Sequence, residues 1–167
     1  MKALLPLLLL PLAATASAES TQPRDAVEGL SGLPVPRYVS LSSGLANLRT
    51  GPGERYPTRW VYKRKGLPLR VVKEYGIWRL VEDPDGDTGW MHRNMMTGQR
   101  TGMAVNDIQE LRARPEDSAR VLWRVAPGVV GTLSDCTHGW CRFSVDKRSG
   151  YIRYDAIWGV DANESFE

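Results

Sequence analysis

An internal repeat constrains the fold of this chain more than any other feature of its sequence. Four short landmarks of the first half recur in the same order in the second half: Leu48-Arg49 as Leu111-Arg112, Lys65-Gly66 as Pro127-Gly128, Gly76-Ile77-Trp78-Arg79 as Gly139-Trp140-Cys141-Arg142, without the extra residue between Gly and Trp, and Thr88-Gly89-Trp90-Met91 as Ser149-Gly150-Tyr151-Ile152. The offsets between the copies run from 63 down to 61 residues, as small loop insertions would produce. The chain therefore contains two copies of one unit of about 60 residues.

Within the first copy, short runs of β-branched and aromatic residues alternate with Gly, Pro and Asp clusters. We predict six strands from them: Tyr38–Leu41, Ala46–Arg49, Arg59–Lys63, Leu69–Lys73, Trp78–Val81 and Thr88–His92. Asp83-Pro84-Asp85-Gly86 fits a tight turn between the last two strands. No window keeps helical apolar spacing over a dozen residues, so long helices are not expected. The predicted fold class is all-β, with short strands of the kind that build small sandwiches or barrels.

These landmarks resemble the bacterial SH3 domain family. The first copy carries Asn47-Leu48-Arg49-Thr50-Gly51-Pro52-Gly53, then an aromatic-Arg pair, then Gly89-Trp90. In the second copy Leu111 to Glu116 lacks the Gly-Pro-Gly turn, and Tyr151 replaces the tryptophan. The resemblance covers roughly residues 37–160 and implies two tandem SH3-like β-barrels, at residues 37–99 and 100–162, with a tail at 163–167. Members of this family commonly serve as envelope-targeting modules, and many recognise peptidoglycan, although one fold hosts many binding roles.

The N-terminus predicts export. Residues 1–18 combine Lys2, an apolar stretch and Ala16-Ser17-Ala18, which is the pattern of a signal peptide cleaved before Glu19. The apolar stretch of about a dozen residues is shorter than the roughly 20 that a spanning helix needs. We therefore expect a periplasmic or extracellular protein with no stable membrane span and no nucleic-acid partner. Residues 19–36 mix Ser, Thr, Gln, Gly and Pro and predict a flexible lead-in.

The two cysteines predict a disulfide. Cys136 and Cys141 bracket Thr-His-Gly-Trp, where a reversing loop from Asp135 to Trp140 should join two strands. Two cysteines of an exported chain at this spacing favour a bond that clamps the hairpin. A metal site with His138 is the alternative, but a fourth ligand of suitable type is missing nearby. A nucleophilic thiol is disfavoured because a cysteine paired with its neighbour cannot stay a thiolate.

Other candidate chemistry is weak. Asp83, Asp85 and Asp87 resemble the start of a calcium loop, but Gly86 comes one position early, so a solvated turn is the better interpretation. His92 and His138 belong to different copies, and no hydrolase motif surrounds either. We therefore expect no enzyme, no cofactor and no metal.

Charge and aromatic side chains concentrate in the first copy. Residues 37–99 carry 11 basic and 6 acidic side chains, against 9 and 10 in residues 100–167. The resemblance to SH3-like barrels implies a groove flanked by the loop Arg49 to Tyr56 and the loop Tyr75–Trp78. We predict Tyr56, Trp78 and Trp90 at its floor and Arg49 and Arg79 at its rim. Aromatic faces stack on sugar rings or apolar groups, and Arg pairs with carboxylate or phosphate. Burial of Trp78 and Trp90 in the core is the alternative.

Two functions stay open from the sequence. The first is a non-catalytic envelope-binding protein that recognises peptidoglycan or another anionic envelope polymer, mostly through its first barrel. The second is a structural or adaptor protein in which the barrels hold an extended segment of a partner protein.

Overall fold

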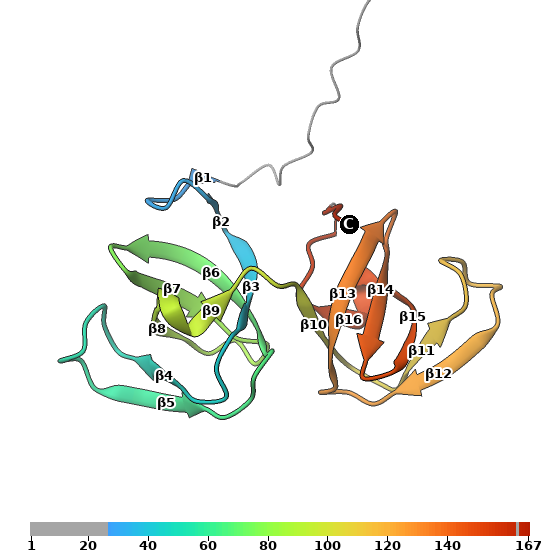
Figure 1. The fold of residues 1–167 in the computed structure, drawn as a ribbon, viewed down its shortest axis with the longest axis horizontal. Coiled ribbons are helices and arrows are strands. Elements are labelled where there is room, and N and C mark those ends of the chain that lie inside the picture. The colour runs from blue at the N-terminus through green and yellow to red at the C-terminus, as the bar shows by residue number, and fades with distance from the viewer. Residues whose placement is uncertain (1–26, 163) are drawn as a thin grey trace, which may run out of the picture.

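The computed structural model describes residues 27–162 and 164–167 and shows two seven-stranded antiparallel sheets, each curled into a barrel-like unit (Figure 1). The first sheet has the order β5-β4-β8-β7-β6-β3-β9 and the second β12-β11-β15-β14-β13-β10-β16. Adding seven to each strand number of the first order gives the second, so the repeat is confirmed at the level of topology. The predicted fold class, all-β with two tandem small barrels, is confirmed as well, and the described residues contain no long helix.

The strands of the first unit match the predicted ones closely. They are β3 (Arg37–Leu41), β4 (Ala46–Arg49), β5 (Thr58–Tyr62), β6 (Pro68–Tyr75), β7 (Trp78–Glu82), β8 (Thr88–His92) and β9 (Met96–Thr97), with the short 3-10 helix η1 (Arg93–Met95) before β9. β4 and β8 have the predicted bounds. β6 is longer than predicted because it continues past a bulge between Val71 and Lys73.

The second unit repeats this order. Its strands are β10 (Thr101–Ala104), β11 (Gln109–Arg112), β12 (Val121–Val125), β13 (Val130–Thr137), β14 (Trp140–Val145), β15 (Arg148–Arg153) and β16 (Ile157–Trp158), with η2 (Tyr154–Ala156) before β16.

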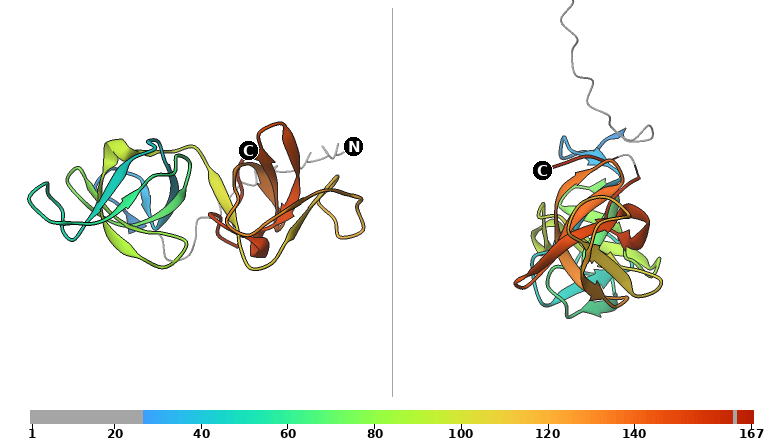
Figure 2. Two further views of the ribbon diagram at one scale, coloured as in Figure 1. Left: turned by 90° about the horizontal axis from the view of Figure 1, so that it is seen from below. Right: turned by 90° about the vertical axis from the view of Figure 1, so that its right-hand side faces the viewer.

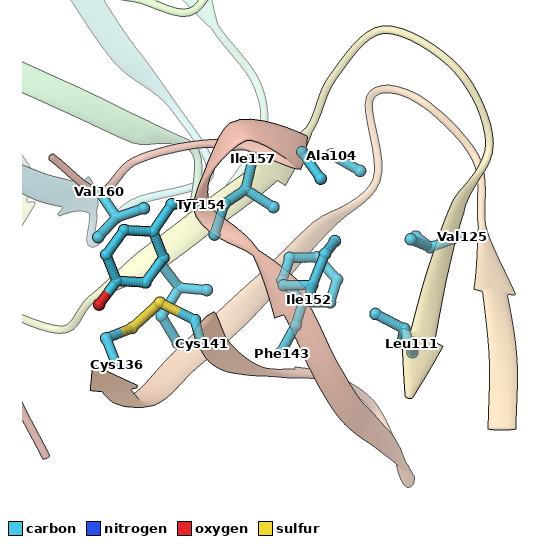
Figure 3. Packing of buried hydrophobic residues seen from close by; sticks show 12 residues of the cluster. Ala104, Leu111, Val125, Cys136, Cys141, Phe143, Ile152, Tyr154, Ile157 and Val160 are labelled. Carbon is cyan, nitrogen blue, oxygen red and sulfur yellow. A yellow bond between two sulfur atoms is a disulfide. The ribbon is translucent and has the colours of Figure 1, made fainter. Parts of the chain in front are cut away.

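Each unit encloses its own core, made by the alternate side chains that point inward from its strands. Figure 3 shows the second core, with Phe143 and Ile152 at its centre. The recurring Leu-Arg and Gly-aromatic motifs contact each other in these cores. A Cβ at Gly89 would lie 2.5 Å from Leu48 Cγ, and one at Gly150 would lie 2.8 Å from Leu111 Cβ. Only glycine permits this approach, which explains why the Leu-Arg and the Gly-aromatic motifs recur together.

Residues 27–36 correct the prediction of a flexible lead-in. β1 (Val27–Glu28) pairs with β2 (Pro34–Val35), and Val35 is buried against the first core. Between them, Ser31 donates its backbone N–H and its hydroxyl to the Glu74 carboxylate, at 2.7 and 2.8 Å. This hairpin is therefore part of the first unit. The predicted signal peptide at residues 1–18 lies outside the described residues. No helix of the described part is long and apolar enough to cross a membrane.

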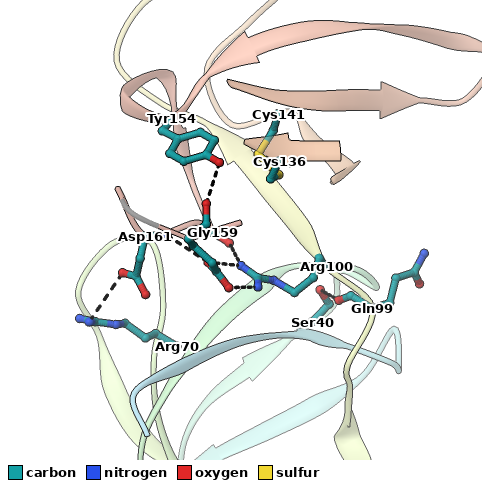
Figure 4. Close-up of polar contacts among 10 residues, drawn as sticks. Ser40, Arg70, Gln99, Arg100, Cys136, Cys141, Tyr154, Gly159 and Asp161 are labelled. Carbon is teal, nitrogen blue, oxygen red and sulfur yellow. Dashed lines mark hydrogen bonds and ion pairs between the residues drawn. A yellow bond between two sulfur atoms is a disulfide. The ribbon is translucent and has the colours of Figure 1, made fainter. Parts of the chain in front are cut away.

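The C-terminal residues are also part of a barrel rather than a tail. Cys136 and Phe166 exchange two backbone hydrogen bonds, of 2.8 and 3.0 Å. Arg100 donates through Nη2 to Glu164 Oε2 at 2.9 Å and to Gly159 O at 2.7 Å (Figure 4).

The two units lie side by side (Figure 2) and touch along this same side (Figure 4). The ring of Tyr38 packs edge-on against Trp158 with centroids 5.0 Å apart, and Arg70 lies 3.9 Å from Asp161. Thr101 Oγ1 donates to Gly66 O at 2.7 Å. Burial, followed by the Asp161 carboxylate, raises the pKa of Tyr38 to about 12. Aromatic, ionic and hydrogen-bonding contacts thus join the units directly.

Candidate functional site

A cleft of about 420 Å³ opens on the outside of the first unit. Its lining comes from the start and end of β4, the loop after β4, the start of β7, the end of β8 and η1: Leu45, Asn47, Arg49, Glu54, Trp78, His92, Asn94 and Met95. Two of the five predicted binding residues, Arg49 and Trp78, therefore line one cleft.

The aromatic wall of this cleft is a product of strand register. Trp78 of β7 lies opposite His92 of β8, and their rings meet edge-on at 5.5 Å. Trp90 stands two residues before His92, on the same outer face, where it lies opposite Arg49 and packs against Tyr75 at 6.5 Å. Trp78 and Trp90 are both half-buried, so each presents part of its ring to solvent.

Arg49 and Tyr56, two of the predicted binding residues, stabilise the loop after β4. Arg49 donates through Nη1 to Glu54 O at 3.0 Å and to Tyr56 O at 2.8 Å, which braces the loop. The Tyr56 ring packs inside this loop rather than at the floor of the cleft, so close to Gly51 that a Cβ there would lie 2.4 Å from Tyr56 Cδ1. His92 accepts the Asn94 backbone N–H through Nδ1 at 3.1 Å and so caps η1.

The second unit has an equivalent cleft, of about 400 Å³. Every lining residue of the first cleft has a counterpart there, 61 to 63 positions later: Leu45 and Ile108, Asn47 and Glu110, Arg49 and Arg112, Glu54 and Asp117, Trp78 and Trp140, His92 and Arg153, Asn94 and Asp155, and Met95 and Ala156. Arg112 braces its loop in the same way, donating to Ala119 O at 2.8 Å. The site is therefore duplicated together with the fold.

The two clefts differ in charge. Asn47 and Asn94 of the first are replaced by carboxylates in the second, where Glu110 pairs with Arg112 at 2.7 Å. Arg153, which replaces His92, lies 3.3 Å from Asp117 and stacks over Trp140 at 5.0 Å. The second cleft is thus more acidic, and its arginines already have carboxylate partners.

Arg79 lies in the interior, not at the rim that the sequence predicted. It alternates with Trp78 along β7, so it points to the opposite face of the sheet. Its Nε lies 3.0 Å from Glu74 Oε1, and the two side chains are only 6% and 1% exposed. Arg37 also reaches Glu74, at 2.7 Å. Burial alone would raise the pKa of Glu74, but the hydrogen bonds from Ser31 and Arg37 and the Arg37 charge outweigh it and lower that pKa.

In the second unit a disulfide occupies the place of this ion pair. Cys136 and Cys141 are bonded and buried, as predicted, and they stand 62 positions after Glu74 and Arg79. Arg79 therefore corresponds to Cys141 rather than to Arg142, which the motif comparison had paired with it. The turns of the two hairpins differ in type, which explains why the motif comparison was displaced by one residue. The first has positive φ at Gly76 alone, as in type II′, and the second at both His138 and Gly139, as in type I′.

The turn around Asp83 uses its carboxylate internally. Asp83 Oδ1 accepts the backbone N–H groups of Asp85 and Asp87, at 3.0 and 2.9 Å, and Oδ2 accepts the Tyr62 hydroxyl at 2.7 Å. The carboxylate thus organises the turn. Within residues 27–162 and 164–167 no group of three or more His, Cys, Asp or Glu side chains is placed to hold a metal ion.

Comparison with known proteins agrees with this architecture. The bacterial SH3 domain family matches residues 42–98 and again residues 105–159, which together make up more than half of the chain. The chain belongs to the bacterial SH3 domain family. A putative N-acetylmuramoyl-L-alanine amidase, YrvJ of Bacillus subtilis, is 23% identical over 122 residues, which are 66% of this chain and 23% of the amidase.

Among solved structures, NlpC2 from Trichomonas vaginalis is 12% identical, with a TM-score of 0.34 over 74% of this chain and 48% of that one. The chain thus spans about a quarter of the curated relative and about half of the solved structure.

Most of the duplicated cleft was missed from the sequence. Leu45, Asn47, Glu54, His92 and Asn94 are ordinary surface residue types, and no motif marks them. The usable signal was the repeat itself, since the Trp78 and Trp140 positions and the acidic Glu54 and Asp117 positions recur at its offset. Aligning the two copies residue by residue shows this pairing.

Proposed function

We propose that this protein is a non-catalytic binding protein of the cell envelope that recognises peptidoglycan or another anionic envelope polymer. The observation that carries the proposal is the duplicated cleft, in which a tryptophan, an arginine and a carboxylate recur at equivalent places in both units. Family membership and the similarity to a putative N-acetylmuramoyl-L-alanine amidase support a cell-wall role. The buried disulfide fits an oxidising compartment, which supports an envelope location.

The chemistry of the first cleft suits a saccharide that carries a carboxylate. The exposed part of Trp78 offers a flat apolar surface for a sugar ring, and Asn47 and Asn94 offer amide donors and acceptors. Arg49 supplies positive charge, although its Nη1 is held by loop carbonyls. The polar groups of the cleft are thus fixed in place to bind, with Arg49 bracing the loop and His92 capping η1.

Charge assigns the stronger anion binding to the first unit. Residues 37–99 carry a surplus of five basic side chains, whereas residues 100–167 carry a surplus of one acidic side chain. The second cleft places Glu110 and Asp155 where the first has neutral amides. An acidic polymer is attracted to clustered positive charge and repelled by these carboxylates, and salt weakens both effects.

Co-sedimentation of the purified chain with isolated sacculi tests this proposal. We expect saturable binding that weakens with salt, and about tenfold weaker binding by the Asn47→Glu, Asn94→Asp variant, whose first cleft carries the acidic residues of the second. The reciprocal variant, Glu110→Asn with Asp155→Asn, is the matched control and should bind at least as well as the wild type. Melting curves establish that each variant is folded. Absence of binding to sacculi contradicts the function, and equal binding by all three proteins contradicts the site.

A further inference from the structure

The end of the second barrel carries an open apolar cleft that the proposed envelope site does not use. It measures about 540 Å³ and lies between β12 and the β14–β15 turn. Its floor is built from Leu111, Val125, Val129 and Val145, all of which belong to the second core or pack against it. The core of this barrel is therefore accessible from one end.

At the corresponding end of the first barrel, a hydrogen-bonded polar pair stands in place of two of these valines. Tyr62 and Asp83 stand at the positions of Val125 and Val145, and both are buried and joined by the 2.7 Å hydrogen bond from the Tyr62 hydroxyl. Burial, then the hydrogen bond to Asp83, raises the pKa of Tyr62, which keeps the hydroxyl a donor. Two valines cannot make this bond, so the same place in the second barrel is left apolar and open.

A tryptophan stands beside each of these ends. Trp60 lies opposite Leu48, and Trp123 lies opposite Leu111, so the two occupy equivalent positions in β5 and β12. Trp60 is 60% exposed and Trp123 is 42% exposed. Trp123 lines the open cleft of the second barrel.

The rim of the open cleft is cationic. Arg148 stacks over the Trp123 ring at 4.9 Å, and Lys147 and Arg124 also line the cleft, with Asp146 as the acidic member. Arg124 Nη2 lies 3.4 Å from Glu110 Oε1, and this ion pair is on the surface. An apolar floor under a positive rim is complementary to a large apolar side chain flanked by carboxylates.

β12, the strand beside the cleft, offers backbone N–H and C=O groups for hydrogen bonding. β12 ends its sheet and, in the described part of the chain, is hydrogen-bonded only to β11. Trp123, Arg124, Val125 and Ala126 line the cleft consecutively, so the outer edge of β12 runs along it. Such an edge pairs with an extended peptide.

We infer that this cleft is a second binding site, which docks an extended acidic segment of a partner protein against β12 and takes one large apolar side chain of that segment. The site is independent of the envelope cleft, since the two lie on different sets of residues.

Fluorescence anisotropy with the full mature chain tests the inference. The probe is a fluorescein-labelled peptide, Glu-Val-Glu-Phe-Glu-Val-Glu, and its counterpart has Lys at every Glu. We expect saturable binding of the Glu peptide and at least tenfold weaker binding of the Lys peptide. The variant Val125→Tyr with Val145→Asp introduces the polar pair of the first barrel and should lower affinity at least tenfold. Trp60→Ala, the matched control, should change it less than twofold.

Several results of these measurements would overturn the inference. Undiminished binding by the Val125→Tyr, Val145→Asp variant overturns the inference, as do equal affinities for the two peptides or an equal loss in Trp60→Ala. Should the double variant fail to fold in a melting test, Arg148→Glu, a change at the exposed rim, takes its place and must also weaken binding about tenfold. Binding to anionic lipid vesicles without binding to the Glu peptide would likewise overturn the inference in favour of a membrane surface.

Discussion

The ion pair between Glu74 and Arg79 yields a sharp prediction about stability. Glu74→Gln keeps the size of the side chain but removes the charge that faces Arg37 and Arg79. Arg79 then remains buried without a counterion, since its other bonds go to the carbonyls of Gly76 and Trp78. Removing one partner of a buried pair costs about 3 kcal/mol or more. With a urea m-value of about 1.5 kcal/mol per molar, the unfolding midpoint of the first barrel should fall by about 2 M.

The pH dependence provides a second check on the same variant. The folded state lowers the pKa of Glu74, so its charge stabilises the fold fully above the ordinary carboxyl value of 4.5. This contribution is lost as pH falls through the lowered value, because the carboxyl group becomes neutral like the Gln amide. The difference between wild type and Glu74→Gln should therefore shrink as pH drops below 4.5.

Urea titrations followed by tryptophan fluorescence at several pH values measure both effects. Glu110→Gln is the control, since its pair with Arg112 is partly exposed and should contribute less than about 1 kcal/mol. A loss below about 1 kcal/mol for Glu74→Gln, or a loss that stays constant down to the lowest pH, would refute the reasoning.

Three further predictions concern the disulfide, export and the aromatic wall. Replacing both cysteines with serine should destabilise the second barrel by about 2 kcal/mol on the loop-closure model and leave the first nearly unchanged, as separate unfolding transitions will show. Thiol titration of the denatured, unreduced chain should find none free; about two per chain would contradict the bond. N-terminal sequencing of the exported protein should begin at Glu19, and retention of Met1 in a membrane fraction would contradict cleavage. Trp78→Ala should weaken sacculus binding without changing its salt dependence, because stacking is not screened by ions; a variant that unfolds instead would identify Trp78 as a core residue.

The sequence was enough to predict the fold because the information that specifies it is local and repeated. The strand–turn punctuation and the recurring motifs needed no knowledge of distant contacts. The position of Arg79 was missed for the opposite reason. Alternation along β7 puts Arg79 on the same face as buried Val81, but a charged residue at an inward position requires a partner, and Glu74 reaches it only across a hairpin. The N-terminal hairpin was missed similarly, since Ser31 is held by that same distant carboxylate.

The two copies differ at three places, and at each of them one set of contacting residues replaces another. At the hairpin, a covalent bond in the second unit replaces the Glu74–Arg79 pair, so that unit needs no buried charge there. At the clefts, carboxylates replace the amides of Asn47 and Asn94 and make the second cleft more acidic. At the barrel ends, valines replace a hydrogen-bonded pair and leave the second core open. Each exchange keeps the strand order, and the last two change residues that line a cleft. We therefore propose that the first unit binds an anionic polymer through its cleft and that the second unit docks an acidic peptide at its barrel end.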